Sequence, residues 1–87
     1  MKRAFVYCTV RPGMFDNEYL VTVNQSSALV SSGNVNAPAL VTGQGVDGKV
    51  RVYVIEEFDD KALVELPGEA VVGGLRAWVP TTSFALA

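Results

Sequence analysis

Two kinds of side chain alternate along three stretches of this chain, residues 3–10, 18–23 and 49–55, and in the first an apolar side alternates with an aromatic one. Strict alternation is typical of a β-strand with one buried face, because successive side chains point to opposite sides of a sheet. In the third stretch valines occupy the even positions, and Arg51 and Tyr53 fall on the other side. The pattern therefore predicts strands with a valine-rich core side and a mixed outer side.

Turn-forming residues divide the first part of the chain. Arg11-Pro12-Gly13 ends the first stretch, since proline fixes φ and glycine permits a positive φ. Residues 3–10 and 18–23 are therefore expected to pair as an antiparallel hairpin. Serine, asparagine and glycine dominate residues 24–36, in which Ala28-Leu29-Val30 is strand-like at most.

Proline and glycine also punctuate the middle of the chain. Residues 37–42 are interpreted as an edge strand, with Pro38 near its start, where no ladder donor is needed. Residues 43–48 are expected to form a flexible turn, and Asp47-Gly48 is its strongest tight-turn signal.

The remainder of the chain predicts further short strands. Residues 56–60 are expected to be an acidic hairpin connection, from which residues 61–66 return antiparallel to the preceding strand. Val71-Val72 is expected to form a short edge strand. Gly73-Gly74 then makes the turn into residues 75–79, which complete the pattern.

Five to seven short strands with turns about every 8–12 residues predict an all-β fold, a small antiparallel barrel. A barrel is favoured because closure removes the sheet edges that otherwise invite aggregation. With 87 residues the chain is too short for two hydrophobic cores. Residues 1–87 are therefore expected to form a single β-barrel domain.

The chain ends with Trp78-Val79-Pro80, then Thr81-Thr82-Ser83, then Phe84-Ala85-Leu86. A strand that runs into a proline and a short 3₁₀ turn before a last short strand resembles the end of SH3-like barrels. The opening Ala4-Phe5-Val6-Tyr7 is similar to the aromatic first strand of that family. The resemblance implies an SH3-like barrel, and an oligonucleotide-binding (OB-like) barrel is the alternative, since the two differ in strand order.

Two groups of SH3-like proteins suggest functions. Tyr7, Pro80 and Phe84 match three positions of the groove in peptide-binding members, but the tryptophan pair of that groove is absent and Phe84 lacks a hydroxyl. The plasmid-borne type II dihydrofolate reductases, tetramers with a shared pore, are similar in size and in a strand followed by proline. Their glutamine, aliphatic and tyrosine motif is replaced by Arg76-Ala77-Trp78, so no catalytic residue is carried over.

Composition and charge narrow the classes of function. Apolar residues make up 49% of the chain, which is rich for a small monomer and favours a homo-oligomer that buries part of this surface. A net charge of −2 disfavours sequence-independent nucleic-acid binding, which needs a basic surface. A single cysteine, no signal-peptide core and no apolar run of about 20 residues lead us to expect a cytoplasmic protein with no membrane partner.

Three motifs with catalytic or ligand-binding potential are assigned structural roles. Gly43, Gly45 and Gly48 have the spacing of a dinucleotide fingerprint, but a strand follows them where a helix is required. The acidic residues at 56–60 are interpreted as a solvated hairpin tip and Cys8 as a small core residue. The chain has no histidine. No catalytic residue, metal site or cofactor is predicted, and the protein is not expected to be an enzyme.

Aromatic and cationic residues on the expected outer sides of strands form the candidate binding surface. Alternation places Tyr53 with Arg51 and Trp78 with Arg76. The five candidate binding residues are Tyr7, Arg51, Tyr53, Arg76 and Trp78. Such a surface can stack bases, bind a peptide or contact another subunit. The competing interpretation is that Trp78 anchors the core, as large aromatic residues often do.

The sequence therefore favours a non-catalytic binding or assembly module that contacts a protein partner or a second copy of itself. Single-stranded nucleic-acid binding is one alternative, and it requires the arginines and tyrosines to form one continuous stripe. A small enzyme with a site shared between subunits is the other, and it requires a symmetric oligomer with a pore.

Overall fold

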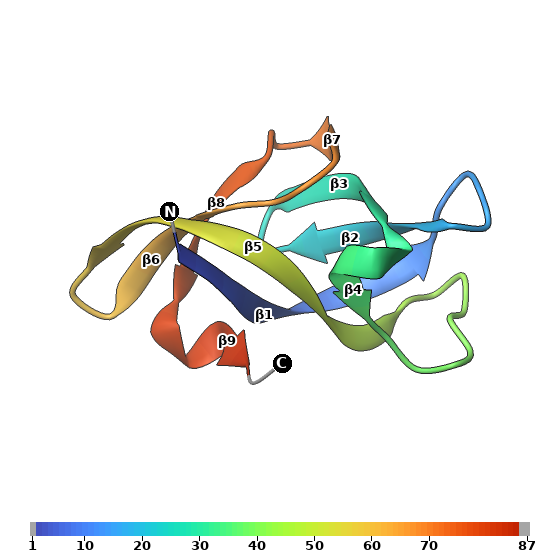
Figure 1. Cartoon of the computed structure of the whole chain (residues 1–87), viewed down its shortest axis with the longest axis horizontal. Coiled ribbons are helices and arrows are strands. Elements are labelled where there is room, and N and C mark those ends of the chain that lie inside the picture. Colours follow the sequence, from blue (N-terminus) through green and yellow to red (C-terminus); the bar gives the residue numbers. More distant parts are fainter. Residues whose placement is uncertain (1, 86–87) are drawn as a thin grey trace.

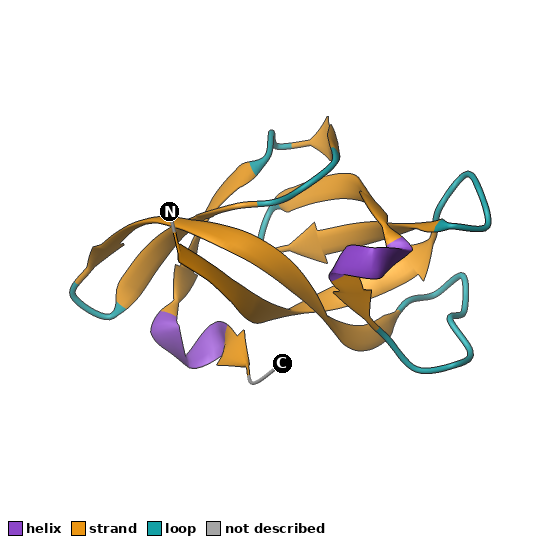
Figure 2. Cartoon of the chain, in the orientation of Figure 1, coloured by secondary structure: helices purple, strands orange, loops and turns teal. Residues whose placement is uncertain are grey.

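The computed structural model describes residues 2–85 and is nearly all β, an antiparallel sheet curled into a half-barrel (Figures 1 and 2). The elements in chain order are β1 (Lys2–Pro12), β2 (Glu18–Val23), β3 (Ser26–Ser31), η1 (Ser32–Asn34), β4 (Val35–Asn36), β5 (Val46–Phe58), β6 (Lys61–Glu65), β7 (Glu69–Val72), β8 (Arg76–Pro80), η2 (Thr81–Ser83) and β9 (Phe84–Ala85). The two η elements are single 3₁₀ turns. No helix among residues 2–85 has the length and apolar character needed to cross a membrane.

The strands follow the order β7-β3-β2-β1-β5-β6-β8, with β4 added to β5 and β9 added to β1. The long strands β1 and β5 run side by side through the centre of the molecule (Figure 1). Every pairing is antiparallel. The most extensive pairing joins the first strand to the middle of the chain, so contacts distant in sequence organise the fold.

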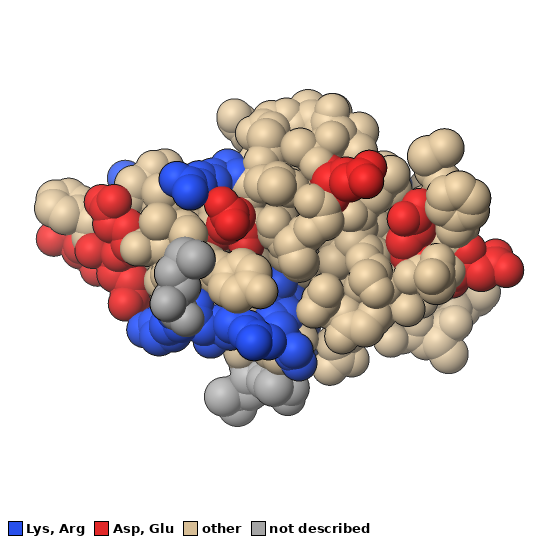
Figure 3. Space-filling view, turned by 45° about the horizontal axis from the view of Figure 1, so that its top comes forward, with Lys and Arg blue, Asp and Glu red and all other residues tan. Residues whose placement is uncertain are grey.

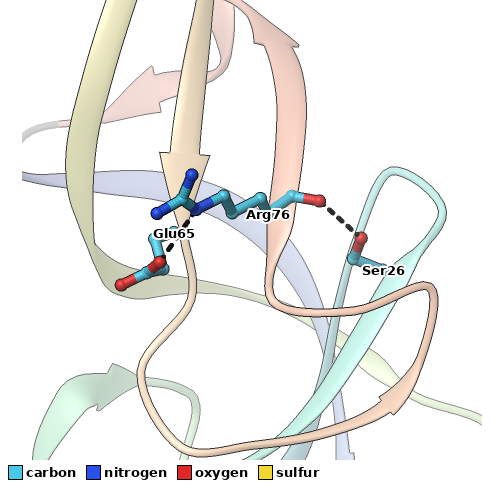
Figure 4. Close-up of polar contacts among 3 residues, drawn as sticks. All are labelled: Ser26, Glu65 and Arg76. Carbon is cyan, nitrogen blue, oxygen red and sulfur yellow. Dashed lines mark hydrogen bonds and ion pairs between the residues drawn. The ribbon is translucent and has the colours of Figure 1, made fainter.

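Side chains hold the β8 end of the curled sheet against the β2–β3 turn. The Asn24 amide donates a hydrogen bond of 2.9 Å to the Trp78 carbonyl oxygen. The Ser26 hydroxyl lies 3.1 Å from the Arg76 carbonyl oxygen, as Figure 4 shows, and 3.2 Å from that of Gly73. Ser26 is buried, so these acceptors satisfy a hydroxyl that would otherwise be costly to bury.

The core consists almost entirely of valine and alanine. Its buried hydrophobic residues are Val6, Val10, Val21, Val23, Ala28, Val30, Val50, Val52, Val54, Ala62, Val64, Leu66, Ala77 and Val79. None of the buried side chains among residues 2–85 is aromatic. Valine suits this position because its branched side chain packs well on a pleated surface. The predicted valine-rich core side is confirmed.

Most of the expected strands are present. The hairpin of residues 3–10 and 18–23 is confirmed as β1 and β2. The closing pattern is confirmed as β8, η2 and β9, and β9 pairs with β1 at Phe5 and Val6. Leu86, the last residue expected in that strand, lies outside the described residues.

The edge strand expected at residues 37–42 is wrong, because this segment is a loop. The β4–β5 ladder ends where Asn36 lies opposite Lys49. Pro38 has no backbone N–H with which to extend it, and Leu40 is 76% exposed.

The turn expected at Asp47-Gly48 is also wrong, because both residues belong to β5. The chain turns earlier, where the Gly45 amide donates a 3.0 Å hydrogen bond to the Thr42 carbonyl oxygen. Gly48 instead allows close packing, since a Cβ there would lie 2.8 Å from Val10 Cγ2 and 3.0 Å from the Asn36 carbonyl oxygen. Gly48 is therefore required by packing between distant parts of the chain, and not by a local turn.

The acidic hairpin connection is shorter than expected. Residues 56–58 continue β5, and the turn itself is Asp59-Asp60, with Asp59 at a φ of 55°. The β5–β6 register shifts between Val54 and Glu56, which marks a bulge. The bulge lets β5 extend beyond the core toward the hairpin tip.

Candidate binding surface

Three cross-strand pairs on β1 and β5 each join one cation to one aromatic residue. The pairs are Arg3 opposite Tyr53, Phe5 opposite Arg51, and Tyr7 opposite Lys49. Directly opposite residues project from the same side of a sheet, so these six side chains share one face. We call this set the β1–β5 face.

Both arginines of the β1–β5 face lie over aromatic rings. Arg3 Cζ is 5.8 Å from the Tyr53 ring centroid, and Arg51 Cζ is 5.4 Å from that of Phe5. These separations are within the range of a cation–π interaction, about 6 Å. Within residues 2–85 neither guanidinium forms an ion pair, so no described carboxylate neutralises it. Both charges remain available to an anionic ligand.

The β1–β5 face ends beside a shallow hollow. Tyr7 and Lys49 line it with Asn36, Ala37, Pro38, Asp47 and Gly48, and its volume is about 260 Å³. The Tyr7 side chain is 56% exposed. An exposed aromatic ring at the edge of a hollow offers a flat apolar surface to a ligand.

The remaining two candidate residues, Arg76 and Trp78, lie on β8, which is separated from β5 by β6. Tyr53 is opposite Glu65 of β6, which in turn is opposite Arg76. Arg76 Nε donates to Glu65 Oε1 at 3.0 Å (Figure 4). The sheet therefore brings Tyr7, Arg51 and Tyr53 onto the β1–β5 face. Arg76 lies outside this face, and its connection to it is the ion pair with Glu65, the residue opposite Tyr53.

The interpretation of Trp78 as a core anchor is wrong. Ala77 and Val79 are the buried residues of β8, and Trp78, which alternates with them, is 42% exposed. Phe58 and Lys61 line a hollow with it. The outward position follows from strand alternation, which here outweighs the tendency of large aromatic residues to be buried.

Charge is unevenly distributed over the surface. Figure 3 shows the visible Lys and Arg atoms in the left half of the molecule, whereas Asp and Glu atoms lie at both ends and also between them, one group beside the Lys and Arg atoms. Four of the nine acidic residues lie around the β5–β6 turn, at positions 56, 57, 59 and 60. The net charge of −2 therefore does not describe every part of the surface.

Neither Cys8 nor the acidic residues form a reactive or metal-binding centre in the described part of the chain. Burial, and secondarily the charge of Asp47, raises the pKa of the Cys8 thiol to about 12. The thiol therefore stays protonated near neutral pH and is a poor nucleophile. Among residues 2–85 no three His, Cys, Asp or Glu side chains are placed to hold a metal ion.

Sequence reasoning missed half of the β1–β5 face, namely Arg3, Phe5 and Lys49. Alternation had placed Phe5 on the same side as Tyr7, which was a usable signal. Their pairing with β5 could not be read, because it depends on the register between strands about 40 residues apart.

Comparisons with protein-family models, curated proteins and solved structures give no match to this chain.

Proposed function

We propose that this protein is a non-catalytic binding module and that the β1–β5 face is its ligand-binding surface. The observation that carries the proposal is the succession of three cation–aromatic pairs across β1 and β5. Aromatic residues and arginine dominate the energetics of binding sites, because they combine a large contact area with directed polar groups. The two arginines without a carboxylate partner favour an anionic ligand.

The SH3-like arrangement and a cytoplasmic location belong to the same proposal. The 3₁₀ turn η2 and the return of β9 to β1 support the first. The unpaired Cys8, which packs against the core, supports the second, since free thiols are typical of reducing compartments.

Nuclear magnetic resonance of isotope-labelled protein tests the binding surface. The probes are oligothymidylate, an oligoglutamate peptide and a proline-rich peptide, added separately. At least one should shift the backbone amide signals of Phe5, Tyr7 and Arg51, and Arg51→Gln should reduce the shifts. Lys2→Gln is the matched control, because Lys2 lies opposite Val54 of the core side and pairs with Glu57. If none of the three probes shifts the β1–β5 face, the proposal fails.

A specific observation also supports self-association, through strand β7. This strand ends the order of the sheet, and all four of its residues are exposed, Val71 by 53% and Val72 by 59%. An exposed apolar edge strand presents unpaired backbone groups to another strand. A second copy of the chain is the simplest partner for this edge, because two β7 strands that pair antiparallel are related by a two-fold axis. A two-fold axis between Ala70 and Val71 would place Glu69 opposite Val72 and keep the carboxylates apart.

Light scattering over a range of protein concentrations tests this association. The native chain should gain mass with concentration, and Val71→Lys should shift it to the monomer, because a charge at the pairing edge opposes association. Leu40→Lys is the control, since Leu40 is also apolar and exposed but lies in the loop before β5. A constant monomer mass for the native chain would contradict self-association.

A further inference from the structure

We infer that the ligand of the β1–β5 face is a single-stranded nucleic acid, an inference that rests on the binding surface proposed above. A nucleic-acid strand repeats two chemical groups, a planar base and an anionic phosphate. The β1–β5 face repeats two complementary groups, an aromatic ring and a cation, in three successive rows. The match between these two repeats is the basis of the inference.

The geometry of a strand sets the spacing of these rows. Residues two apart on one strand project from the same face and are separated by about 6.6 Å. Phe5 and Tyr7 have this relation on β1, and Arg51 and Tyr53 have it on β5. Bases of an extended strand can stack on the Tyr7 ring and on the guanidinium planes of Arg3 and Arg51, which lie over Tyr53 and Phe5. Stacking tolerates any sequence because every base has a flat face.

The charge balance of the whole chain does not oppose this ligand. Nucleic-acid affinity depends on the cations that contact phosphates, so local charge is decisive. Neither Arg3 nor Arg51 has a carboxylate partner among residues 2–85. Glu65, which lies opposite Tyr53 on β6, is already bound to Arg76. Four of the nine acidic residues lie at positions 56, 57, 59 and 60, around the β5–β6 turn. Among the residues described, Asp47 is the one carboxylate that lines the hollow beside Tyr7 and Lys49.

The hollow beside Tyr7 provides a place for one base that has turned away from its neighbours in the strand. Its volume is about 260 Å³, and its lining combines the Tyr7 ring with the polar residues Asn36 and Asp47. A base that enters can stack on the ring and direct its polar edge toward these side chains. A duplex holds its bases within the helix, so only a single strand can use the hollow and the rings together.

An acidic peptide is the main competing ligand, and it uses only part of the face. Its carboxylates could contact Arg3 and Arg51, but it offers no flat partner to Phe5, Tyr7 and Tyr53. The regular alternation of rings and cations therefore favours the nucleic acid over the peptide.

Fluorescence anisotropy of a labelled oligothymidylate of about ten nucleotides, within the usual site size of small barrels, tests the inference. Tyr7→Ser should weaken binding about 5- to 100-fold, as expected for the loss of one stacked base. Tyr7→Phe keeps the ring and should bind nearly as well as the native chain. Tyr7 is largely exposed, so neither substitution removes a core contact.

Salt dependence separates phosphate contact from stacking. If Arg3 and Arg51 each neutralise one phosphate, log K should fall with log[salt] with a slope of about −1.4. Arg51→Gln should reduce that slope to about −0.7, whereas Lys2→Gln should leave it nearly unchanged. A slope near zero would overturn the inference.

The other outcomes distinguish the inference from the proposed function. If oligoglutamate shifts the β1–β5 face and oligothymidylate does not, the nucleic-acid inference is overturned and the binding module stands. Equal affinity for a DNA duplex would overturn the single-strand preference, because the rings cannot reach paired bases. If no probe binds the face, both the inference and the proposed function fail.

Discussion

The inner and outer sides of β1 and β5 share one backbone but differ in the burial, polarity and charge of their side chains. On the inner side Val6, Val50 and Val52 are fully buried and belong to one apolar cluster. On the outer side the β1–β5 face carries only cations and aromatic rings. A single ladder of hydrogen bonds supports both sides, because neighbouring residues of a strand point in opposite directions.

This difference separates stability from binding at the level of single residues. Inner substitutions should change the free energy of unfolding, and outer substitutions should change binding with little effect on the fold.

The largest expected effect concerns Cys8, on the inner side of β1. Its pKa is raised from an ordinary value of 9.0 to about 12, first by burial and then by Asp47. At pH 8 the thiolate population should be roughly a thousandfold lower than in the unfolded chain, since each pKa unit is a factor of ten. Alkylation by iodoacetamide, followed by mass spectrometry with and without denaturant, should show a slowing of that order. Equal rates in both conditions would contradict the burial of the thiol.

The same shift predicts how stability depends on pH. The folded chain holds the thiol proton more tightly than the unfolded chain, so this contribution is complete below pH 9. It should be lost as the pH rises from about 9 to about 12. Urea unfolding across this range should show a steeper loss of stability for the native chain than for Cys8→Ala, which removes the titrating group.

Leu66 and Leu40 provide a matched comparison of a buried and an exposed leucine. Leu66 is the largest fully buried side chain, and Leu40 is on the surface. Leu66→Ala should lower the free energy of unfolding by about 3 kcal/mol, through lost burial and the cavity that remains. Leu40→Ala should change it by less than about 0.5 kcal/mol. Similar losses for the two variants in denaturant titrations would disprove the assignment of the core.

Gly48 and Gly43 compare the crowded side of β5 with an open turn. A Cβ at Gly48 would press on Val10 and on the Asn36 backbone, whereas a Cβ at Gly43 would meet no atom within 4 Å. Gly48→Ala should destabilise the fold by about 1–3 kcal/mol, as overpacking does. Gly43→Ala should be nearly neutral in the same thermal unfolding experiment. A neutral Gly48→Ala would show that β4 and β5 are not closely packed.

The smallest expected effect is on the outer surface. Glu65→Gln removes the exposed ion pair with Arg76 and should cost less than about 0.5 kcal/mol, because solvent screens such pairs. Chemical unfolding at low and high salt measures the change. A loss above 1 kcal/mol that disappears in salt would show that the ion pair stabilises the sheet more than an ordinary surface pair does.

The buried positions could largely be predicted from the sequence, because alternation is a local property. The period of two identified Val50, Val52 and Val54 as inner residues without knowledge of their partners. The β1–β2 hairpin was also predictable, since its turn signal lies within a few residues of both strands. Gly48 was not, because the atoms that exclude a side chain there come from Val10 and Asn36.

The candidate surface was predictable only in part, for a related reason. Arg51 and Tyr53 were placed on one face from local alternation alone. Their neighbours Phe5 and Arg3 are set by the register of β1 on β5, which joins residues far apart in the chain. The exposure of Trp78 followed from alternation with Ala77 and Val79, but residue size suggested the opposite.

The absence of aromatic residues from the described core has a spectroscopic consequence. Trp78 is the single tryptophan of the chain, and it is 42% exposed beside Phe58 and Lys61. Because the indole is only partly covered in the native state, its emission should shift less on unfolding than that of a buried tryptophan. A blue shift of this emission would therefore report a partner that covers β8. Trp78 thus gives the chain an intrinsic optical probe for docking on that strand.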